Sequence, residues 1–267
     1  MNNKSIGVFD SGLGGLTAVK SICELMPNEN IVYFGDTGRI PYGTKSAQTI
    51  KRYSEGDINF LLSHDVKLVV IACGTASSVA LADMRGRFSV PIVGVVGAAC
   101  AAAAAACKNG KIGVIGTATT IKSGSYEAGI HKINGDIGVY SAACPMFVPL
   151  VENGYFDAEI TRILIDEYLH AIKAAGVDTL ILGCTHYPLL AKAISEYLGG
   201  GVRLINPCAE LAASLGGILG AENLAENRRG VCEYYVSDDP EGFAALGGVF
   251  LDRKIDGQVK KIDIEKF

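Results

Sequence analysis

Two short stretches decide the fold: LVVIACGT at residues 68–75 and TLILGCT at residues 179–185. In each, a short apolar run leads into a cysteine, and a threonine follows closely. Such runs are typical of parallel strands that are buried on both faces. Each stretch is preceded at a similar distance by the same tripeptide, IGV, at residues 6–8 and 112–114. The matched order predicts an internal repeat of two similar α/β units.

Short apolar runs alternate with helical stretches along the rest of the chain, which predicts an α/β protein with parallel sheets. We expect strands at residues 5–9, 30–34, 68–72, 91–95, 111–115, 137–141, 179–182 and 202–205. Helices are expected at residues 98–108 and 157–175, the second with Asp157 as N-cap and Gly176 at its end. The more polar segment from residue 231 to 267 should add an edge strand around Tyr234, Tyr235 and Val236.

The composition excludes several classes of protein. Of the 267 residues, 49% are hydrophobic and 19% are charged, so the chain can bury a sizeable core and whole-chain disorder is excluded. The net charge is −4 and no run of Lys or Arg stands out, which argues against nucleic-acid binding. The uncharged run 88–107 is long enough to span a bilayer, but proline and glycine interrupt it and alanine dominates its second half. We therefore expect no membrane span.

The eight cysteines are best explained by a reducing compartment. Asp10 interrupts the apolar N-terminal run, so no signal peptide is expected, and a cytoplasmic location fits unpaired thiols. No Cys-x-x-Cys is present, and none of the four histidines is spaced from a cysteine like a zinc ligand, so no metal is expected.

Cys73 and Cys184 are the strongest candidates for chemistry, because ligands of open α/β sheets bind beyond the carboxyl ends of the strands. Two facing units would place these thiols on opposite sides of one cleft. A base on one face of a carbon and an acid on the other is what a racemase needs. Each cysteine taken alone is equally consistent with a small buried hydrophobic residue. The other six cysteines lack this context and are interpreted as structural.

Three further polar residues are candidates, each with a structural alternative. Asp10 opens the sequence DSGLGG after the first strand and could orient or deprotonate a group in the cleft, or simply cap a loop. The glycines of DSGLGG match neither the dinucleotide-binding fingerprint nor the P-loop. His186 could act as the base for Cys184, and Glu152 is a lone acid that would otherwise be a surface residue. Tyr42 and Gly43 lie in a loop that could line a ligand site.

The ordered motifs resemble those of the cofactor-independent glutamate racemases, and the resemblance covers nearly the whole chain. The motifs are GVFDSGLGG (7–15), GDTGRIPYG (35–43), ACGTA (72–76), GT (116–117), PLVENG (149–154) and GCTHYP (183–188). The resemblance implies two flavodoxin-like parallel-sheet domains related by pseudo-twofold symmetry, with the active site between them. The first would comprise residues 1–97 plus 207–267, and the second residues 98–206.

The same resemblance implies the roles of individual residues. Cys73 and Cys184 would be the two acid/base groups, Asp10 would assist Cys73, and Glu152 and His186 would assist Cys184. Contacts to the amino acid would come from Asp10, Ser11, Pro41, Tyr42, Gly43, Gly74, Thr75, Thr117, Thr185 and His186. Neither pyridoxal phosphate nor another cofactor nor a metal would be needed. The protein would be a cytoplasmic homodimer that supplies D-glutamate for peptidoglycan, with no nucleic-acid or membrane partner.

Two positions depart from the family pattern. Gly74 stands where the family has an asparagine, so a side chain that would bond the substrate is missing and the loop carrying Cys73 should be looser. Residues 206–207 read Asn-Pro where the family has Asp-Ser, a change that we expect to be peripheral. The alternatives are therefore an aspartate or broad-specificity racemase, or a weakened member acting as a binding or regulatory protein. Some glutamate racemases are reported to bind DNA gyrase, which gives the last alternative a precedent.

Overall fold

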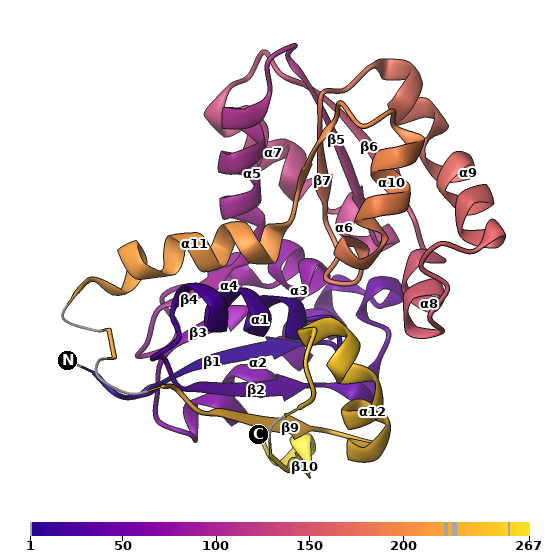
Figure 1. The fold of residues 1–267 in the computed structure, drawn as a ribbon. Helices are drawn as coiled ribbons and strands as arrows, with labels where there is room; N and C mark the ends of the chain where they lie inside the picture. The colour runs from indigo at the N-terminus through magenta and orange to yellow at the C-terminus, as the bar shows by residue number, and fades with distance from the viewer. Residues whose placement is uncertain (1, 222–223, 226–228, 256) are drawn as a thin grey trace.

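The strands form two parallel sheets, as the alternating pattern predicts (Figure 1). The computed structural model describes residues 2–221, 224–225, 229–255 and 257–267. The first sheet has the strand order β10-β9-β2-β1-β3-β4, and each neighbouring pair is parallel. Its strands are β1 (Ser5–Asp10), β2 (Ile31–Gly35), β3 (Val66–Ile71), β4 (Ile92–Gly94), β9 (Cys232–Val236) and β10 (Val259–Lys261).

The second sheet has the order β6-β5-β7-β8 and is also parallel throughout. Its strands are β5 (Lys111–Gly116), β6 (Gly138–Ala143), β7 (Thr179–Leu182) and β8 (Arg203–Ile205). This order repeats the β2-β1-β3-β4 part of the first sheet, so β5 corresponds to β1 and β7 to β3. The repeated sequence runs thus occupy matching places, which confirms the predicted pair of α/β units and all eight expected strands.

Two strands differ from expectation in their surroundings. The strand around Tyr234 was expected at an edge, but β9 lies between β2 and β10 because the last residues of the chain add β10 outside it. The second sheet has β6 and β8 at its edges, and Tyr140 and Ser141 of β6 are exposed. Burial on both faces therefore holds for the inner strands and not for β6.

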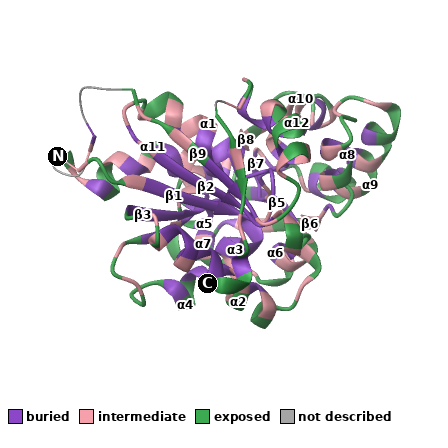
Figure 2. Ribbon diagram, turned by 90° about the horizontal axis from the view of Figure 1, so that it is seen from below, coloured by how far each residue is buried: buried purple, intermediate pink, exposed green. Residues whose placement is uncertain are grey.

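Helices cover the two faces of the first sheet, because alternate residues of its strands face opposite sides. Ile6 and Val8 pack with α1 and α12, whereas Phe9 packs with α2 on the other side. Figure 2 shows the buried strands enclosed by helices whose outer sides are exposed. The helices are α1 (Leu16–Leu25), α2 (Ala47–Leu62), α3 (Gly74–Val79), α4 (Leu81–Met84), α5 (Val95–Ala106), α6 (Ala118–Lys122), α7 (Ser125–Ile133), α8 (Phe147–Glu152), α9 (Glu159–Ala175), α10 (Ala191–Tyr197), α11 (Pro207–Leu219) and α12 (Pro240–Leu251).

Both predicted helices form, with one correction. The helix expected from residue 157 is α9, and its N-cap is Ala158, which makes no side-chain cap; the prediction of Asp157 was wrong. Asp157 accepts a hydrogen bond from Arg162 instead (2.9 Å), a partner one turn along the helix. Gly176 ends the helix with φ of 68°, the left-handed conformation that glycine adopts without strain.

The chain crosses between the two sheets twice, through α5 and α11. These helices pack against each other, and α11 also packs on α1 (Figure 1). The predicted domain boundary at residues 97/98 falls inside α5, and that at 206/207 falls at the start of α11. These boundaries stay a prediction, and part of the first predicted domain (residues 1, 222–223, 226–228 and 256) lies outside the described residues.

The uncharged run at residues 88–107 is divided between β4 and α5. Within the residues that the structure describes, no helix has the length and apolar character needed to cross a membrane.

Candidate active site

The carboxyl ends of the four central strands carry most of the predicted site residues. Asp10 ends β1 and Cys73 lies two residues beyond β3, while Thr117 and Cys184 take the corresponding places after β5 and β7. In parallel α/β sheets this edge binds ligands where the strand order reverses. The Thr185 hydroxyl lies 3.5 Å from Asp10 Oδ1, so the ends of the two sheets meet.

Cys73 is 5% exposed and lies at the N-terminus of α3. Its Sγ accepts a hydrogen bond from the Ala76 N–H (3.4 Å) and lies 3.6 Å from the Ser11 hydroxyl. Burial raises the pKa of Cys73 to about 11, with a further contribution from the charge of Asp10, although the Ala76 and Ser11 contacts oppose the shift. The Cys73 thiol is therefore protonated at pH 7.

Asp10 is the buried carboxylate between the two thiols. One oxygen accepts the Gly12 N–H (3.0 Å) and the other faces the Thr185 hydroxyl. Burial raises the pKa of Asp10 above its usual value, and the nearby His186 opposes this. A raised pKa makes a buried carboxylate a better proton acceptor, so Asp10 is a candidate to exchange a proton with a neighbouring group.

Cys184 belongs to a chain of three polar side chains. Its Sγ lies 3.9 Å from Nδ1 of His186, and Nε2 of His186 lies 2.9 Å from Glu152 Oε1. Burial raises the pKa of Cys184 well above that of a free thiol, and the charges of Cys73 and Asp10 add to the effect. The Glu152 side chain is one-third exposed and comes from the end of α8, so the apolar run before it serves to place this acid.

The contact with Glu152 determines which ring nitrogen of His186 can accept a proton. When Nε2 donates its hydrogen to the carboxylate, Nδ1 carries the lone pair and faces the Cys184 thiol. The ring is also held at its side by Phe250 of α12, with an edge-on contact of 5.2 Å between ring centroids. His186 is thus positioned to accept a proton from Cys184. Phe250 was not predicted, because its part of the chain carries no motif.

The Tyr42 side chain is buried within the first unit. It is 1% exposed, its hydroxyl donates to Asp36 (2.5 Å), and Asp57 lies 2.9 Å from the same hydroxyl oxygen. Arg39 bridges the same two carboxylates, at 2.7 Å from each. The network fixes the loop that also carries the exposed Pro41 and leaves the backbone of Tyr42 and Gly43 as the part that a ligand could contact.

Tyr42→Phe is expected to lower the free energy of unfolding by about 1–3 kcal/mol, because two buried carboxylates lose a shared donor. Urea denaturation measures this loss. Tyr140→Phe is the matched control, since that side chain is 37% exposed, and it should change stability by less than about 0.5 kcal/mol. Equal losses in the two variants would contradict the structural role of the network.

Three threonine hydroxyls join the two units beside the thiols. Thr75 lies 2.9 Å from Thr117 and 3.2 Å from Thr120, and Thr117 lies 2.9 Å from Thr120. The predicted pair of Thr75 and Thr117 is thus brought together, and Thr120 completes the cluster. Thr120 was missed by the sequence analysis because it lies one turn into α6 rather than in a motif.

Close glycine contacts hold the two units together. An added Cβ on Gly14 would lie 2.1 Å from the Thr185 hydroxyl, and one on Gly43 would lie 2.8 Å from the Thr117 side chain. An added Cβ on Gly74 would lie 2.3 Å from the carbonyl oxygen of Gly183. The absence of a side chain at Gly74 lets the loop of Cys73 pack directly on the loop of Cys184. The looser loop expected from this glycine stays a prediction.

A narrow void, too small for a water molecule, lies behind Cys184 and Gly74. Pro207 and Cys208 line it, so the expectation that the departure at residues 206–207 is peripheral was wrong. Cys208, which we interpret as structural, is buried beside this void. It lies three residues beyond β8, whereas Cys73 and Cys184 each lie two residues beyond their strands.

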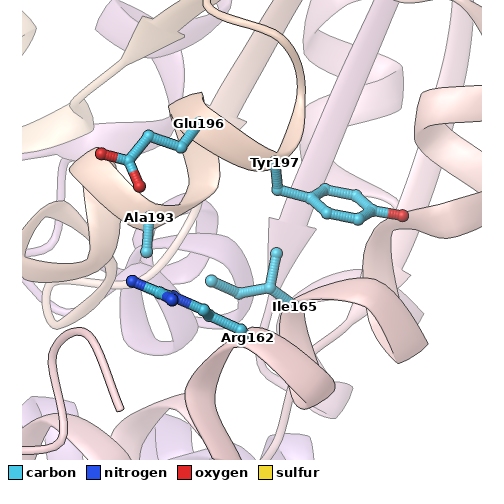
Figure 3. A pocket seen from close by; sticks show the side chains of 5 residues that line it. All are labelled: Arg162, Ile165, Ala193, Glu196 and Tyr197. Carbon is cyan, nitrogen blue, oxygen red and sulfur yellow. The ribbon is translucent and has the colours of Figure 1, made fainter. Parts of the chain in front are cut away.

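A second hollow lies on the outer side of the second unit, between α9 and α10. Figure 3 shows Arg162 and Ile165 facing Ala193, Glu196 and Tyr197 across it. Its charged groups have partners elsewhere, Arg162 with Asp157 and Glu196 with Lys192. Among the described residues, no group of three or more His, Cys, Asp or Glu side chains is arranged to hold a metal ion. The strand ends that carry Cys73 and Cys184 are the better candidate site.

Comparison with known proteins agrees with this site. The model of the Asp/Glu/Hydantoin racemase family matches residues 16–215. Glutamate racemase from Geobacter metallireducens is 46% identical over 264 residues, which cover 98% of this chain and 97% of the relative. The crystal structure of glutamate racemase from Francisella tularensis in complex with D-glutamate matches with a TM-score of 0.93 at 36% identity over 100% of both chains. The isoform RacE1 from Bacillus anthracis gives a TM-score of 0.94 at 36% identity over 98% of both chains.

The chain belongs to the Asp/Glu/hydantoin racemase family and is a racemase, an enzyme of the isomerase class. Its relatives at this level of identity are glutamate racemases, so the resemblance found in the motifs is confirmed.

Proposed function

We propose that the protein interconverts L-glutamate and D-glutamate by proton transfer between two thiols, without a cofactor. The observation that carries the proposal is the placement of Cys73 and Cys184 at matching strand ends in two facing units. The glutamate racemases to which the chain is similar, including the Francisella enzyme in complex with D-glutamate, support glutamate as the substrate. The product D-glutamate would supply peptidoglycan synthesis.

In the proposed reaction one thiolate removes the proton from Cα and the opposite thiol donates a proton to the other face. The C–H electron pair remains on Cα until the second thiol protonates it, so the configuration is inverted. One thiol and one thiolate exchange states in each turnover, and the roles are reversed in the other direction. Donors to the substrate carboxylate stabilise the carbanion between the two transfers.

The neighbouring groups prepare each thiol for this exchange. Because burial and the charge of Asp10 keep the Cys73 thiol protonated, its thiolate must form after substrate binds. The substrate ammonium group favours the negative charge of this thiolate. Asp10 is placed to take the Cys73 proton. On the other side His186, held by Glu152, is placed to take the proton of Cys184.

The amino acid would bind between the glycine and threonine loops. Ser11, Thr75, Thr117 and Thr185 offer hydroxyls, and the loop at Tyr42 and Gly43 offers backbone groups. Pro41 shapes this loop, while Gly74 contributes backbone only. Because the Gly14, Gly43 and Gly74 contacts close the two units on each other, substrate entry requires that the units separate. Closure around the substrate would then exclude water from the thiolate.

The test is optical: purified protein is added to L-glutamate without any cofactor, and the circular dichroism of the amino acid is followed. Decay of the signal to zero supports the proposal, and D-glutamate should decay to the same end point. A flat trace with both glutamates and decay with L-aspartate would instead identify an aspartate racemase. A flat trace with both amino acids would favour a binding or regulatory protein.

Glu152→Gln is expected to lower kcat about 10- to 100-fold with little change in KM, because a neutral amide holds and charges His186 less well. Since the equilibrium constant between enantiomers is one, kcat/KM must fall equally in both directions. The control is Glu159→Gln at the exposed start of α9, which should leave both constants unchanged. An unchanged kcat in Glu152→Gln, at unchanged melting temperature, would remove Glu152 from the proposed machinery.

We further propose a cytoplasmic homodimer. Support comes from large apolar side chains that are exposed on and beside α8 and α9, namely Met146, Tyr155, Ile160 and Ile163, which are 46–56% exposed. Sedimentation equilibrium at micromolar concentration should return about twice the chain mass of 28.0 kDa. A monomer mass at all concentrations would contradict the assembly and leave the racemase proposal intact.

A further inference from the structure

A second pair of thiols lies far from the cleft. Cys23 is in the last turn of α1 and Cys232 is the first residue of β9, and their sulfur atoms are 3.6 Å apart. Cys232 pairs with Ile31, the first residue of β2, so it lies at the amino end of the sheet. Asp10 and Cys73 lie beyond the carboxyl end. The pair is therefore separate from the proposed racemase site.

The surroundings of the pair are open and carry positive charge. Both cysteines are half-buried and line a hollow together with Arg229 and Arg253. The Arg253 guanidinium interacts with both sulfur atoms. Glu29 also lines the hollow, and its carboxylate pairs with Lys67 at 2.6 Å.

The two sulfur atoms differ in acidity. The hydrogen bond between the two sulfur atoms, together with Arg253, lowers the pKa of Cys232 to about 7. The same hydrogen bond and burial raise the pKa of Cys23. A free thiol titrates near 8.5, so at pH 7 the thiolate fraction of Cys232 is on the order of ten times that of a free thiol. Cys232 is thus suited to attack an electrophile and Cys23 to follow it.

We propose that Cys23 and Cys232 form a peroxide-sensitive thiol pair that closes to an intrachain disulfide. The Cys232 thiolate attacks one oxygen of hydrogen peroxide, which breaks the O–O bond, forms the sulfenic acid and releases hydroxide. The Cys23 sulfur then attacks the sulfenic sulfur, and the proton that it loses combines with the hydroxide that it expels to form water. Overall, one hydrogen peroxide becomes one water and one hydroxide. The two sulfurs are oxidised by two electrons and the peroxide is reduced.

The geometry permits the second step. A disulfide needs the sulfurs at about 2.05 Å, so they must approach by roughly 1.6 Å from contact distance. Cys23 lies two residues from the end of α1, where a helix yields more easily than in its middle. The bond would join residues far apart in sequence, so it should raise the melting temperature by about 5 °C or more.

The test is a peptide map of the full chain after a small excess of hydrogen peroxide at pH 7, alkylated and digested without reduction. The expected product is a linked peptide containing Cys23 and Cys232, about 2 Da lighter than the two reduced peptides together. Cys23→Ser should stop at a Cys232 sulfenic acid that dimedone traps. Cys232→Ser should leave Cys23 reduced.

Two further variants test which groups determine the rate of oxidation of Cys232. Arg253→Leu should slow oxidation of Cys232 several-fold, whereas Cys107→Ser, which changes a thiol elsewhere, should leave it unchanged. A reduced pair after excess peroxide, a link between two chains, or faster oxidation of Cys107 would each overturn the proposal. The readout is mass, so the result does not depend on racemase activity.

Discussion

Replacing either Cys73 or Cys184 with serine is expected to lower kcat for racemisation of glutamate at least about 10³-fold, in both directions. A serine hydroxyl is a far weaker acid than a thiol, so neither the anion that removes the Cα proton nor the acid that returns it forms readily. A factor of 10³ corresponds to about 4 kcal/mol of transition-state stabilisation. The loss should be similar for the two positions, because each turnover uses both thiols.

Hydrogen exchange in D₂O distinguishes two separate thiols from a single reactive one. In the unaltered protein, the enantiomer that is formed first should carry deuterium at Cα while the recovered substrate does not. Each serine variant keeps one thiol and should exchange deuterium into a single enantiomer without inversion. The Cys73→Ser and Cys184→Ser variants should label opposite enantiomers, as NMR of the Cα proton would show.

Cys107→Ser is the control, since Cys107 follows α5 on the far side of the second unit and should keep full activity. Retention of more than about a tenth of kcat in either active-site variant would contradict the two-thiol mechanism. Labelling of the same enantiomer by both variants would contradict the placement of the thiols on opposite faces.

The sequence predicted the fold well because the deciding signals are local. A buried parallel strand is recognisable from a few consecutive apolar residues. The repeat of residues 68–73 at 179–184 is enough to predict that β3 and β7 are equivalent strands of the two units. Strand ends also located Asp10, Cys73 and Cys184. The order of the outer strands was not predictable, since whether β9 or β10 forms the edge depends on how the last thirty residues return to the sheet.

Contacts between segments far apart in sequence account for the remaining differences. Tyr42 was expected at the ligand, and only the structure shows that Asp36 and Asp57 draw its hydroxyl into the first unit. No sequence pattern brings Cys23 next to Cys232 across 209 positions. The close packing of Gly74 on Gly183 was not predictable for the same reason, because it joins segments of the two units.

Gly74→Asn, which places the usual family residue in this chain, is expected to lower kcat about 10²-fold rather than restore a lost contact. The new Cβ would lie 2.3 Å from the Gly183 carbonyl oxygen and 3.7 Å from Cys184 Cα. Relief of the first contact requires the two thiol loops to part by about 1 Å, and a displacement of that size can cost about 10²-fold in rate. The overpacking should also lower stability by about 2 kcal/mol, a decrease of roughly 4–8 °C in melting temperature.

Gly74→Ala separates the added bulk from the added amide, because it carries the same Cβ without the polar group. If packing against Gly183 dominates, the alanine and asparagine variants should lose activity and melting temperature to a similar degree. Gly97→Ala is the matched control: this glycine also lies in the first turn of a helix, nothing lies within 4 Å of its added Cβ, and the change should stabilise by up to about 1 kcal/mol. Higher activity in Gly74→Asn than in the unaltered protein would show that the loops part easily and that the missing amide limits the reaction. Because closure would then tolerate a side chain at position 74, the direct packing of Gly74 on Gly183 could not be what holds the two thiols in place.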